Sequence, residues 1–366
     1  MDFDLTEDQQ AVADLAQQIL KDLASHERQR DLEKAGWPDG ARFDPELWKA
    51  LADAGLLGIA VPEVHGGAGL GFIELAAILQ QAGRTTAPVP LLETLVLGAL
   101  PLAGFGSDAQ QAAWLPKVAS GEAVLTAALA GDAAVEAVAD GDGFRLSGTR
   151  LFVPFAERAD LVLVPARTDA GTAVFLVPGD AAGLAKEPLA TTSGRPEAKL
   201  TLDGVRVGAG DRLGDDGDAV VAWTTLRAAS ATCMVALGVC EAALDLTSEY
   251  VKTRKQFDQP IAMFQAVGHR AADAYIDTEA IRLTAWQAAW RIGVGEDAAE
   301  QVAIAKFYAS EAGKRVVHAA THLHGGVGVD REYPLHRYFL AARHLELQFG
   351  SGTPQLLELG RLLAAG

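Results

Sequence analysis

Cysteine is scarce in this sequence, because Cys233 and Cys240 are the only two in 366 residues. On one helix they would lie two turns apart, roughly 10 Å at a rise of 1.5 Å per residue, which is beyond the reach of a disulfide. A disulfide framework is therefore excluded, and a chain of this length must be stabilised by its own core. We expect both cysteines to be small core residues in a reducing compartment, and the cytoplasm is the expected location.

Positively charged residues are also few compared with acidic residues. Lysine and arginine together number 31 against 48 aspartate and glutamate residues, so the formal net charge is −17. Nucleic acids and anionic membrane surfaces both require clustered lysine and arginine. The composition therefore argues against nucleic acid and membrane as partners, although an anionic small ligand needs only a few local cations.

Long apolar runs are missing as well. The most apolar stretches are 91–106, which Glu93 and Pro101 interrupt, and 231–240, and we expect neither to span a bilayer. The N-terminus, MDFDLTEDQQ, is acidic and has no basic segment followed by an apolar run, so a secretory signal is not expected. The sequence also has no internal repeat and no low-complexity tract. What remains is a soluble globular protein of two or three domains.

Residues 1–118 have the pattern of a helical domain. Thr6 and Gln9 form a capping box, which predicts the start of a first helix. The apolar residues expected on the buried face of that helix are Val12, Leu15, Ile19 and Leu23. Asp44 and Pro45 predict the N-cap and the first position of a second helix.

Residues 119–218 predict a compact β-domain. Short β-rich runs such as FRLSGTRLFVPF (144–155) and AKLTLDGVRV (198–207) are separated by glycine, aspartate and proline. The segment GDDGD (214–218) then links to residues 219–366, where long helices joined by short loops predict a four-helix bundle. The predicted fold is mainly α, with an N-terminal helical domain, a middle β-domain and a C-terminal bundle.

Two stretches in the C-terminal half are specific enough to suggest a family. They read TRKQFDQPIAMFQAVGHRAAD (253–273) and HLHGGVGVDREYPLHRY (322–338), and together they resemble the acyl-CoA dehydrogenase family. VPEVHGGAGLG (61–71) and LTLDGVRV (200–207) fit the corresponding places in that family's N-terminal and middle domains. The resemblance covers essentially the whole chain in the right order.

The resemblance implies a fold, a reaction and a cofactor. The fold is the acyl-CoA dehydrogenase fold, with a β-barrel-like middle domain and subunits assembled as a dimer of dimers. The substrate is an acyl-CoA, from which a carboxylate takes the α-proton while the β-hydrogen leaves as hydride to the flavin of FAD. In this family the FAD lies across a subunit boundary, with its isoalloxazine on one subunit's β-domain and its ADP end on the neighbour's bundle. An electron-transferring flavoprotein is the acceptor that the family commonly uses.

Carried over residue by residue, the resemblance implies that this chain holds the ADP end of FAD. The residues that match are Arg254, Phe257, Phe264, Gln265, His322, Gly325 and Gly326. A guanidinium at 254 can pair bidentately with a pyrophosphate, and two glycines let backbone approach a ligand closely. Asp258 departs from the family pattern, which has glycine there. His322 stands where glutamine is common, and an imidazole still donates one hydrogen bond. The alternative reading of Arg254 is an ordinary surface arginine.

A metal site is the second reading of His322. His318 and His322 are four residues apart, the spacing of a pair of helical ligands. No third ligand stands at a useful distance along the sequence, so we expect no metal.

The segments that would serve the flavin end match the family poorly. Where the family has a first flavin-contacting loop, this chain reads LTAALAGD (125–132) and keeps only Thr126 and the Gly131-Asp132 pair. The second loop reads Phe152-Val153-Pro154-Phe155, in which proline has no amide proton and phenylalanine has no hydrogen-bonding side chain. We expect these residues to pack as core instead.

The family's catalytic base has no counterpart here. That base is a glutamate just before a Gly-Thr pair, and the position holds Phe349 when counted from Tyr333-Pro334, or Ser351 when aligned on Gly352-Thr353. Neither side chain can take an α-proton unassisted. The family's alternative base position falls in LRAASATCMVALG (226–238), which has no carboxylate. Glu346 lies one turn too early and is expected to point elsewhere, so the catalytic residue is unknown.

This pattern of losses favours a division of labour between unlike subunits. Heteromeric α2β2 members of the family occur in bacterial degradation of steroid side chains, and one of their subunits lacks the base and completes its partner's FAD site. The chain resembles that kind of subunit. Three alternatives stay open: a self-sufficient homotetramer with a base that the motifs do not reveal, a non-catalytic binding or structural protein, and a flavin oxidase or monooxygenase. The acyl group is not encoded in any motif.

Overall fold

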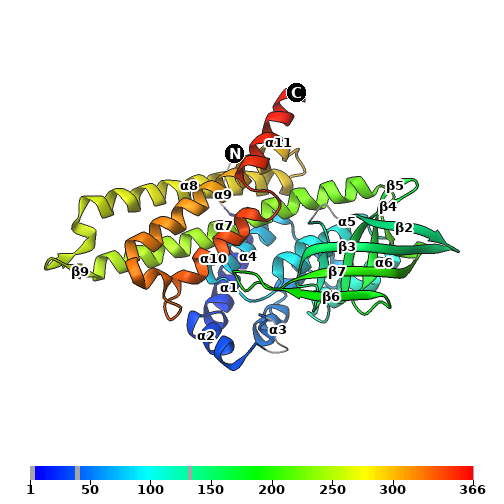
Figure 1. Cartoon of the computed structure of the whole chain (residues 1–366), viewed down its shortest axis with the longest axis horizontal. Helices are drawn as coiled ribbons and strands as arrows, with labels where there is room; N and C mark the ends of the chain where they lie inside the picture. Colours follow the sequence, from blue (N-terminus) through cyan, green and yellow to red (C-terminus); the bar gives the residue numbers. More distant parts are fainter. Residues whose placement is uncertain (1–4, 38–41, 131–133, 366) are drawn as a thin grey trace. The chain divides into compact units, whose positions relative to one another are not determined.

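The computed structural model describes residues 5–37, 42–130 and 134–365 (Figure 1). The chain forms two compact units. The helical unit comprises Met1–Ala35, Phe72–Ala87 and Ala229–Gly366, and the sheet unit comprises Gly36–Gly71 and Pro88–Ala228. The three sequence domains expected at 1–118, 119–218 and 219–366 stay a prediction.

The helical unit is built around α9, which α8, α10 and α11 all contact. Its helices are α1 (Glu7–Leu23), α2 (His26–Ala35), α4 (Phe72–Thr85), α7 (Gly217–Thr253, which begins in the sheet unit), α8 (Gln265–Gly293), α9 (Ala299–His324), α10 (Leu335–Leu347) and α11 (Gly352–Ala365). Short elements join them: β9 (Lys255–Gln256), β10 (Gln259–Pro260), η6 (Ile261–Met263) and η7 (Gly325–Val329). A mainly helical chain with a sheet in the middle and a helical C-terminal region confirms the predicted fold class.

Helix α1 confirms one local prediction and corrects another. The capping box of Thr6 and Gln9 is present in both directions. The predicted apolar face is wrong for Leu15, which is 40% exposed, whereas Val12, Ile19 and Leu23 are half-buried. The residues that the helix buries are Ala13, Ala16 and Leu20. Alanine's small side chain lets α1 lie close against α4, so the packed face runs through alanines rather than through the largest apolar residues.

Helix α7 is the long apolar element of the chain. Among the described residues it is the one helix long and apolar enough to cross a membrane. Its most apolar stretch is 78% buried inside the protein, as a core helix would be. Cys233 and Cys240 lie on α7 as buried, free thiols, which confirms their predicted role.

The sheet unit contains eight hydrogen-bonded strands in the order β6-β7-β3-β2-β4-β5-β8, with β1 paired in parallel to β4. The strands are β1 (Leu125–Ala127), β2 (Val135–Asp140), β3 (Gly143–Pro154), β4 (Leu161–Thr168), β5 (Gly171–Pro178), β6 (Leu184–Leu189), β7 (Glu197–Gly208) and β8 (Arg212–Leu213). Strands β4 and β5 are the most apolar, and their side chains are buried along most of their length, with Phe175 at the centre of the core. The longest ladder joins β3 to β7 and is interrupted by irregularities, one of them between Arg150 and Val153.

The helices of the sheet unit precede and flank the strands. They are α3 (Pro45–Asp53), η2 (Leu56–Gly58), η3 (Glu63–His65), the π-helix η4 (Leu92–Ala99), α5 (Leu100–Phe105), α6 (Asp108–Ala119) and η5 (Ala209–Asp211). The predicted start of α3 is confirmed, since the Asp44 carboxylate accepts the amides of Glu46 and Leu47. The π-helix packs closely on β1: a Cβ on Gly98 would lie 2.3 Å from the Leu125 side chain, so this contact requires glycine.

Candidate functional site

The turn between α7 and α8 carries the first candidate segment. Arg254 directly follows α7, and a tight antiparallel hairpin of β9 and β10 places Phe257 and Asp258 at its tip. Both tip residues have positive φ, 53° for Phe257 and 63° for Asp258. The family's glycine at position 258 thus coincides with a left-handed backbone, a conformation that aspartate tolerates better than most residues.

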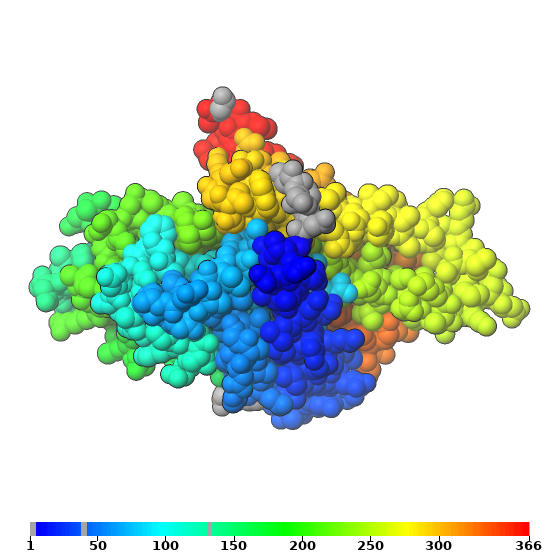
Figure 2. Space-filling view, turned by 180° about the vertical axis from the view of Figure 1, so that it is seen from behind, coloured from blue at the N-terminus to red at the C-terminus, as the bar shows by residue number. Residues whose placement is uncertain are grey.

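This hairpin leaves both apolar surface and positive charge uncovered. Phe257 is 88% exposed, and its ring meets Phe264 edge to face at a centroid distance of 6.1 Å. Arg254 is exposed and has no ion-pair partner within the described parts of the chain. In the space-filling view the yellow tip that contains this hairpin stands clear of the other helices of its unit (Figure 2). Exposed apolar surface beside an unpaired guanidinium is suited to a ligand or another chain.

The start of α8 lies next to that hairpin in the chain. Phe264 is the N-cap of α8 and its side chain makes no capping hydrogen bond, while Gln265 is the exposed first residue of the helix. The amides of Val267 and Gly268 donate to the carbonyl of Phe264. The positive end of a long helix therefore faces outward here, and such ends favour anions.

The second candidate segment is the glycine turn after α9. Gly325 has φ 63° and ψ −140°, a combination that is essentially restricted to glycine. No heavy atom lies within 4 Å of where a Cβ on Gly325 or Gly326 would be, so the backbone of this turn is open to a ligand. Gly328 is different, because a Cβ there would lie 2.9 Å from the carbonyl oxygen of Thr321. Its role is close packing, and the sequence reading did not single it out.

An aromatic cluster brings these two segments together. The Tyr250 and His324 rings are stacked at 4.3 Å, and the Tyr250 hydroxyl donates to the His324 carbonyl at 3.4 Å. His324 Nε2 lies 3.1 Å from the Tyr333 hydroxyl. Figure 1 shows the turn labelled β9 and the orange end of α9 at the same end of the bundle. His322, which was chosen from the sequence, is exposed, whereas His324 is buried between the two segments.

Several hydrogen-bonding groups of the predicted flavin-end loop in the sheet unit are used within the chain. Pro154 has no amide proton, the Phe155 amide donates to Pro196 O at 3.0 Å, and Val153 pairs with Ala198 in the ladder. The Thr126 hydroxyl, which matched the family, is buried and donates to Pro154 O at 2.8 Å. The Gly131-Asp132 pair lies outside the described residues. This loop does not fit an isoalloxazine, whose N5 and O4 need donors.

The expectation that residues 152–155 pack as core was wrong for one of them. Val153, Pro154 and Phe155 are buried, but Phe152 is 53% exposed with φ 55°. The β-bulge between Arg150 and Val153 explains the difference, because an extra residue in one strand breaks the alternation of inward and outward side chains.

A buried ion pair fixes the surroundings of Phe155. Glu93 on the π-helix η4 is 0% exposed and pairs with the Arg195 guanidinium, which lies 5.8 Å from the centroid of the Phe155 ring. Arg195 directly precedes Pro196, whose carbonyl accepts the Phe155 amide. The loop is therefore occupied by contacts within the chain on both its backbone and its ring side.

The segment where the family has its base is held rigidly but offers none. Phe349 is half-buried with φ 52°, and its carbonyl accepts the Gln355 side-chain amide at 2.8 Å. The Glu346 carboxylate is buried in ion pairs with Arg343 and Lys314, so it is committed to cations as expected of a residue that points elsewhere. No carboxylate in this segment is free to abstract a proton.

A fully buried lysine anchors the same segment. Lys306 Nζ donates to Ser310 Oγ at 2.9 Å and to the carbonyls of Leu345 and Glu346 at 3.1 and 3.2 Å. Burial lowers the pKa of Lys306 to about 8. The sequence reading missed this residue, although its spacing of four from Val302 and from Ser310 places it on the buried stripe of α9.

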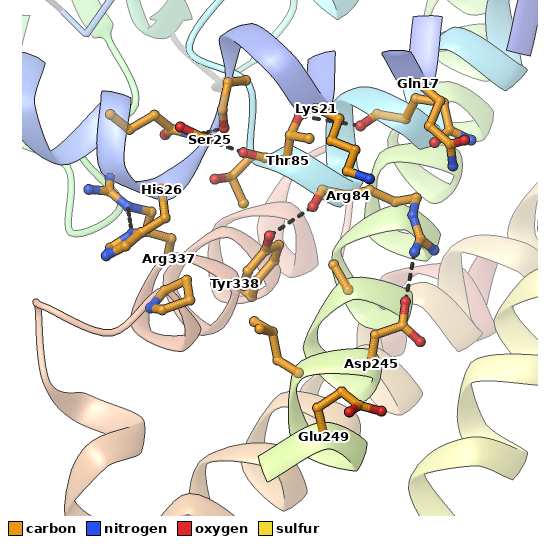
Figure 3. Close-up of a pocket in the computed structure, with 17 residues that line it drawn as sticks. Gln17, Lys21, Ser25, His26, Arg84, Thr85, Asp245, Glu249, Arg337 and Tyr338 are labelled. Atoms are coloured by element: carbon orange, nitrogen blue, oxygen red, sulfur yellow. Dashed lines mark hydrogen bonds and ion pairs between the residues drawn. The ribbon is translucent and has the colours of Figure 1, made fainter. Parts of the chain in front are cut away.

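A cavity of about 630 Å³ lies elsewhere in the helical unit, between α1, α4, α7 and α10 (Figure 3). Arg84 on its wall donates to Asp245 at 2.6 Å and to Glu241 at 2.8 Å. Arg337 donates to both oxygens of Glu33, at 2.6 and 2.8 Å. Because both arginines are neutralised by carboxylates of this chain, the cavity is poorly suited to the pyrophosphate of a cofactor.

The two histidines considered as a metal pair do not converge. His318 packs edge to face against Phe339 at 5.0 Å, and His322 is exposed. Within residues 5–37, 42–130 and 134–365, no three histidine, cysteine or acidic side chains are grouped as metal ligands.

Comparison with known proteins points to the same family as the motifs. Residues 6–122 match the N-terminal domain of acyl-CoA dehydrogenases, and residues 215–363 match their C-terminal domain. The chain is 46% identical to acyl-CoA dehydrogenase FadE27 of Mycobacterium tuberculosis, an alignment that covers 100% of this chain and 99% of the relative.

Solved structures give the same result. One chain of the ChsE4–ChsE5 complex from Mycobacterium tuberculosis is 45% identical, with a TM-score of 0.95 and 100% coverage of both chains. One chain of a variant of the Tcur3481–Tcur3483 steroid ACAD is 43% identical, with a TM-score of 0.91 and 98% coverage of both chains.

Proposed function

The chain belongs to the acyl-CoA dehydrogenase family, with FAD as cofactor, and we propose that it is the base-less subunit of a heteromeric member. In this proposal it completes the FAD site of a homologous partner subunit in an α2β2 assembly. The partner supplies the carboxylate that takes the α-proton and the pocket for the isoalloxazine. Similar chains in solved structures belong to two-component complexes, which supports this assignment.

The contrast between the two ends of the cofactor site carries the proposal. The ADP-side segments have an unpaired Arg254, an open glycine turn and an outward-facing start of α8. The flavin-side loop has its donors used within the chain, as the Phe155 amide and the Thr126 hydroxyl illustrate. A chain that fits only one end of FAD needs a second chain for the other end.

The residues of this chain therefore have binding and orienting roles. Arg254 would pair with the pyrophosphate, while Phe257, Phe264 and Gln265 would lie along the adenosine side. Gly325 and Gly326 would bring backbone amides close to the ADP portion, with exposed His322 at the edge of the turn. When bound, FAD supplies the hydride acceptor for the β-hydrogen of the substrate.

Exposed apolar side chains supply surface for the partner subunit. On α8 they are Tyr275, Ile276 and Leu283, and on α11 they are Leu356, Leu357 and Leu363. Several exposed apolar side chains on one helix are suited to a protein contact. Since the partner of such a subunit is homologous, these helix faces are suited to an assembly of the α2β2 type.

The substrate we propose is a steroid side-chain CoA ester. The observation in its favour is that a 43% identical structure is described as a steroid ACAD. An electron-transferring flavoprotein is the proposed electron acceptor, and the cytoplasm is the proposed location. A self-sufficient homotetramer is the second candidate, because half-sites of the family also meet across identical subunits.

Co-expression tests the proposal. We expect the chain produced alone to lack stoichiometric flavin in its visible spectrum, and to gain it when co-expressed with a homologous chain that has the glutamate. Stoichiometric flavin in the chain alone, with dehydrogenase turnover, would establish the homotetramer instead.

A further inference from the structure

The two ADP-side segments follow different helices, and both are exposed. One is an exposed hairpin after α7, and the other is a turn that begins with two glycines after α9. A cofactor contact made by both requires that their separation be fixed before binding, because ordering them on binding costs affinity. Within the described residues, the contact that joins the two helix ends is made by Tyr250 and His324.

His324 is attached to its surroundings at three points. Its Nδ1 lies 2.8 Å from the Ala320 carbonyl, so this nitrogen carries the proton. Nε2 is then an acceptor, and the Tyr333 hydroxyl at 3.1 Å donates to it. The backbone carbonyl of His324 accepts the Tyr250 hydroxyl at 3.4 Å. With the ring 3% exposed, its orientation is fixed by hydrogen bonds as well as by packing.

These attachments connect directly to the proposed cofactor residues. His324 immediately precedes Gly325 and so sets where the glycine turn begins. Tyr250 lies one helical turn before Arg254, whose amide donates to the Tyr250 carbonyl at 2.8 Å. Tyr333 belongs to the loop that leads from η7 to α10. An aliphatic residue at 324 would fill the space but would make none of the ring's hydrogen bonds.

We infer that His324 is a positioning residue for the cofactor, which holds the glycine turn in register with Arg254 through Tyr250 and Tyr333. The inference rests on the proposed function, since it takes these segments to be the ADP-binding half of the site. It adds a specific role for a buried histidine that contacts no cofactor atom itself.

The test measures the FAD dissociation constant of the protein in its native assembly, by flavin fluorescence. His324→Phe keeps an aromatic ring against Tyr250 and removes both nitrogens, and Tyr333→Phe removes one hydroxyl. We expect FAD to bind roughly three- to thirtyfold more weakly in His324→Phe and about two- to tenfold more weakly in Tyr333→Phe, the range for one or two lost hydrogen bonds. Turnover at saturating FAD should be restored in both.

The double variant tests whether the two residues act through one bond. If they do, His324→Phe combined with Tyr333→Phe binds FAD no more weakly than His324→Phe alone, within about twofold. Strictly additive effects on the FAD dissociation constant would mean that Tyr333 acts independently of His324. The proposed positioning through the bond between Tyr333 and His324 would then be wrong.

Tyr338→Phe is the matched control. The Tyr338 hydroxyl donates to the Arg84 carbonyl at 2.8 Å in the same unit, away from the proposed site. We expect this variant to lose some thermal stability and to keep its FAD affinity. Equal weakening of FAD in Tyr338→Phe and Tyr333→Phe would show a general effect of stability and overturn the inference.

Arg254→Ala distinguishes a failure of the positioning role of His324 from a failure of the proposed function. If Arg254→Ala leaves FAD binding unchanged, the ADP half of the site lies elsewhere and the proposed function fails. If Arg254→Ala weakens FAD while His324→Phe and Tyr333→Phe stay within twofold of the parent protein, the positioning role alone is wrong. Tyr333→Phe keeps the test decisive should His324→Phe fail to fold.

Discussion

At the scale of single residues, Arg254 contrasts most clearly with Phe152. Both are exposed, and in the proposed function they belong to the two ends of the cofactor site. Within the described residues no carboxylate pairs with Arg254, so its positive charge is available to an anionic ligand. The Phe152 side chain has no group that could hydrogen-bond a flavin.

We predict that Arg254→Ala lowers the FAD affinity of the assembled complex more than Phe152→Ala does. A charge-assisted, bidentate contact contributes on the order of 1.5–3 kcal/mol, roughly ten- to a hundredfold in affinity. The measurement is flavin content after gel filtration, with Arg361→Ala on α11 as a control for general loss of positive charge. If Phe152→Ala folds and empties the complex while Arg254→Ala does not, the assignment of the two ends is reversed.

Lys306 gives a pH-dependent prediction. In the folded protein the pKa of Lys306 is about 8, below the ordinary value of 10.5. Compared with the unfolded chain, the folded protein therefore favours the neutral amine. Between these values the unfolded chain binds more protons than the folded one, and the contribution of Lys306 to stability therefore rises with pH in that window. The expected gain is on the order of 2 kcal/mol between pH 8 and pH 10.

Urea unfolding at both pH values, in the parent protein and in Lys306→Met, measures this contribution. The difference in unfolding free energy between the two proteins should change by that amount from pH 8 to pH 10. A difference that is independent of pH would show that the buried lysine keeps its ordinary pKa.

At the scale of elements, the connection between α10 and α11 is held by hydrogen bonds but contains no catalytic base. Lys306 and Ser310 hold the last carbonyls of α10, and Gln355 holds the carbonyl of Phe349. A carboxylate placed in this connection would therefore be well positioned. It would still lack a hydride acceptor, since the chain's own flavin-side loop has its donors occupied.

We predict that neither Phe349→Glu nor Ser351→Glu creates acyl-CoA dehydrogenase activity in the chain alone. Orientation of base and acceptor around the reacting bond accounts for several kcal/mol of such a barrier, so a base by itself achieves little. Phe349→Glu should also destabilise the fold, because it places a charge at a half-buried site. Turnover of a panel of CoA esters, with circular dichroism as a folding control, provides the measurement. A folded, flavin-containing glutamate variant that turns over would show that only the base is missing.

Structural features that depend on residues close together in the chain were predictable from the sequence. The caps at Thr6 and Asp44 depend on residues two or three positions apart, and both are present. The exposure of Leu15 on α1 was not predictable from apolar periodicity, because the covered face of a helix depends on how the helix packs. The exposure of Phe152 follows from a β-bulge in the pairing of β3 with β7. The sequence of β3 alone does not indicate this bulge.

The candidate site was predictable only in part, for a similar reason. The motif around Arg254 and the glycine pair are visible as sequence. Their convergence depends on Tyr250 and Tyr333, which contact His324 across 74 and 9 residues of chain. Lys306 was visible as a charge on an apolar stripe, but its three acceptors become apparent only when α9 and α10 are packed.

At the scale of the whole molecule, the proposed function combines an intact family fold with half of a cofactor site. Exposed apolar faces on α8 and α11 and an 88% exposed Phe257 are surfaces that a second subunit would cover. Such surfaces lower solubility unless they are buried in an assembly. A division of labour accounts for the surviving ADP-side motifs, the occupied flavin-side loop and the missing base together.

The central claim, that the chain is catalytically incomplete alone, is tested most directly by its own turnover. The measurement is oxidation of CoA esters of varied chain length and of steroid side chains, with an artificial electron acceptor, by the purified chain free of any partner. We predict no activity with any substrate, because general-base catalysis alone is worth about 10²–10⁴ in rate and no carboxylate occupies either family position. We also predict activity when the homologous glutamate-bearing chain is added. Robust turnover by the chain alone would contradict the account.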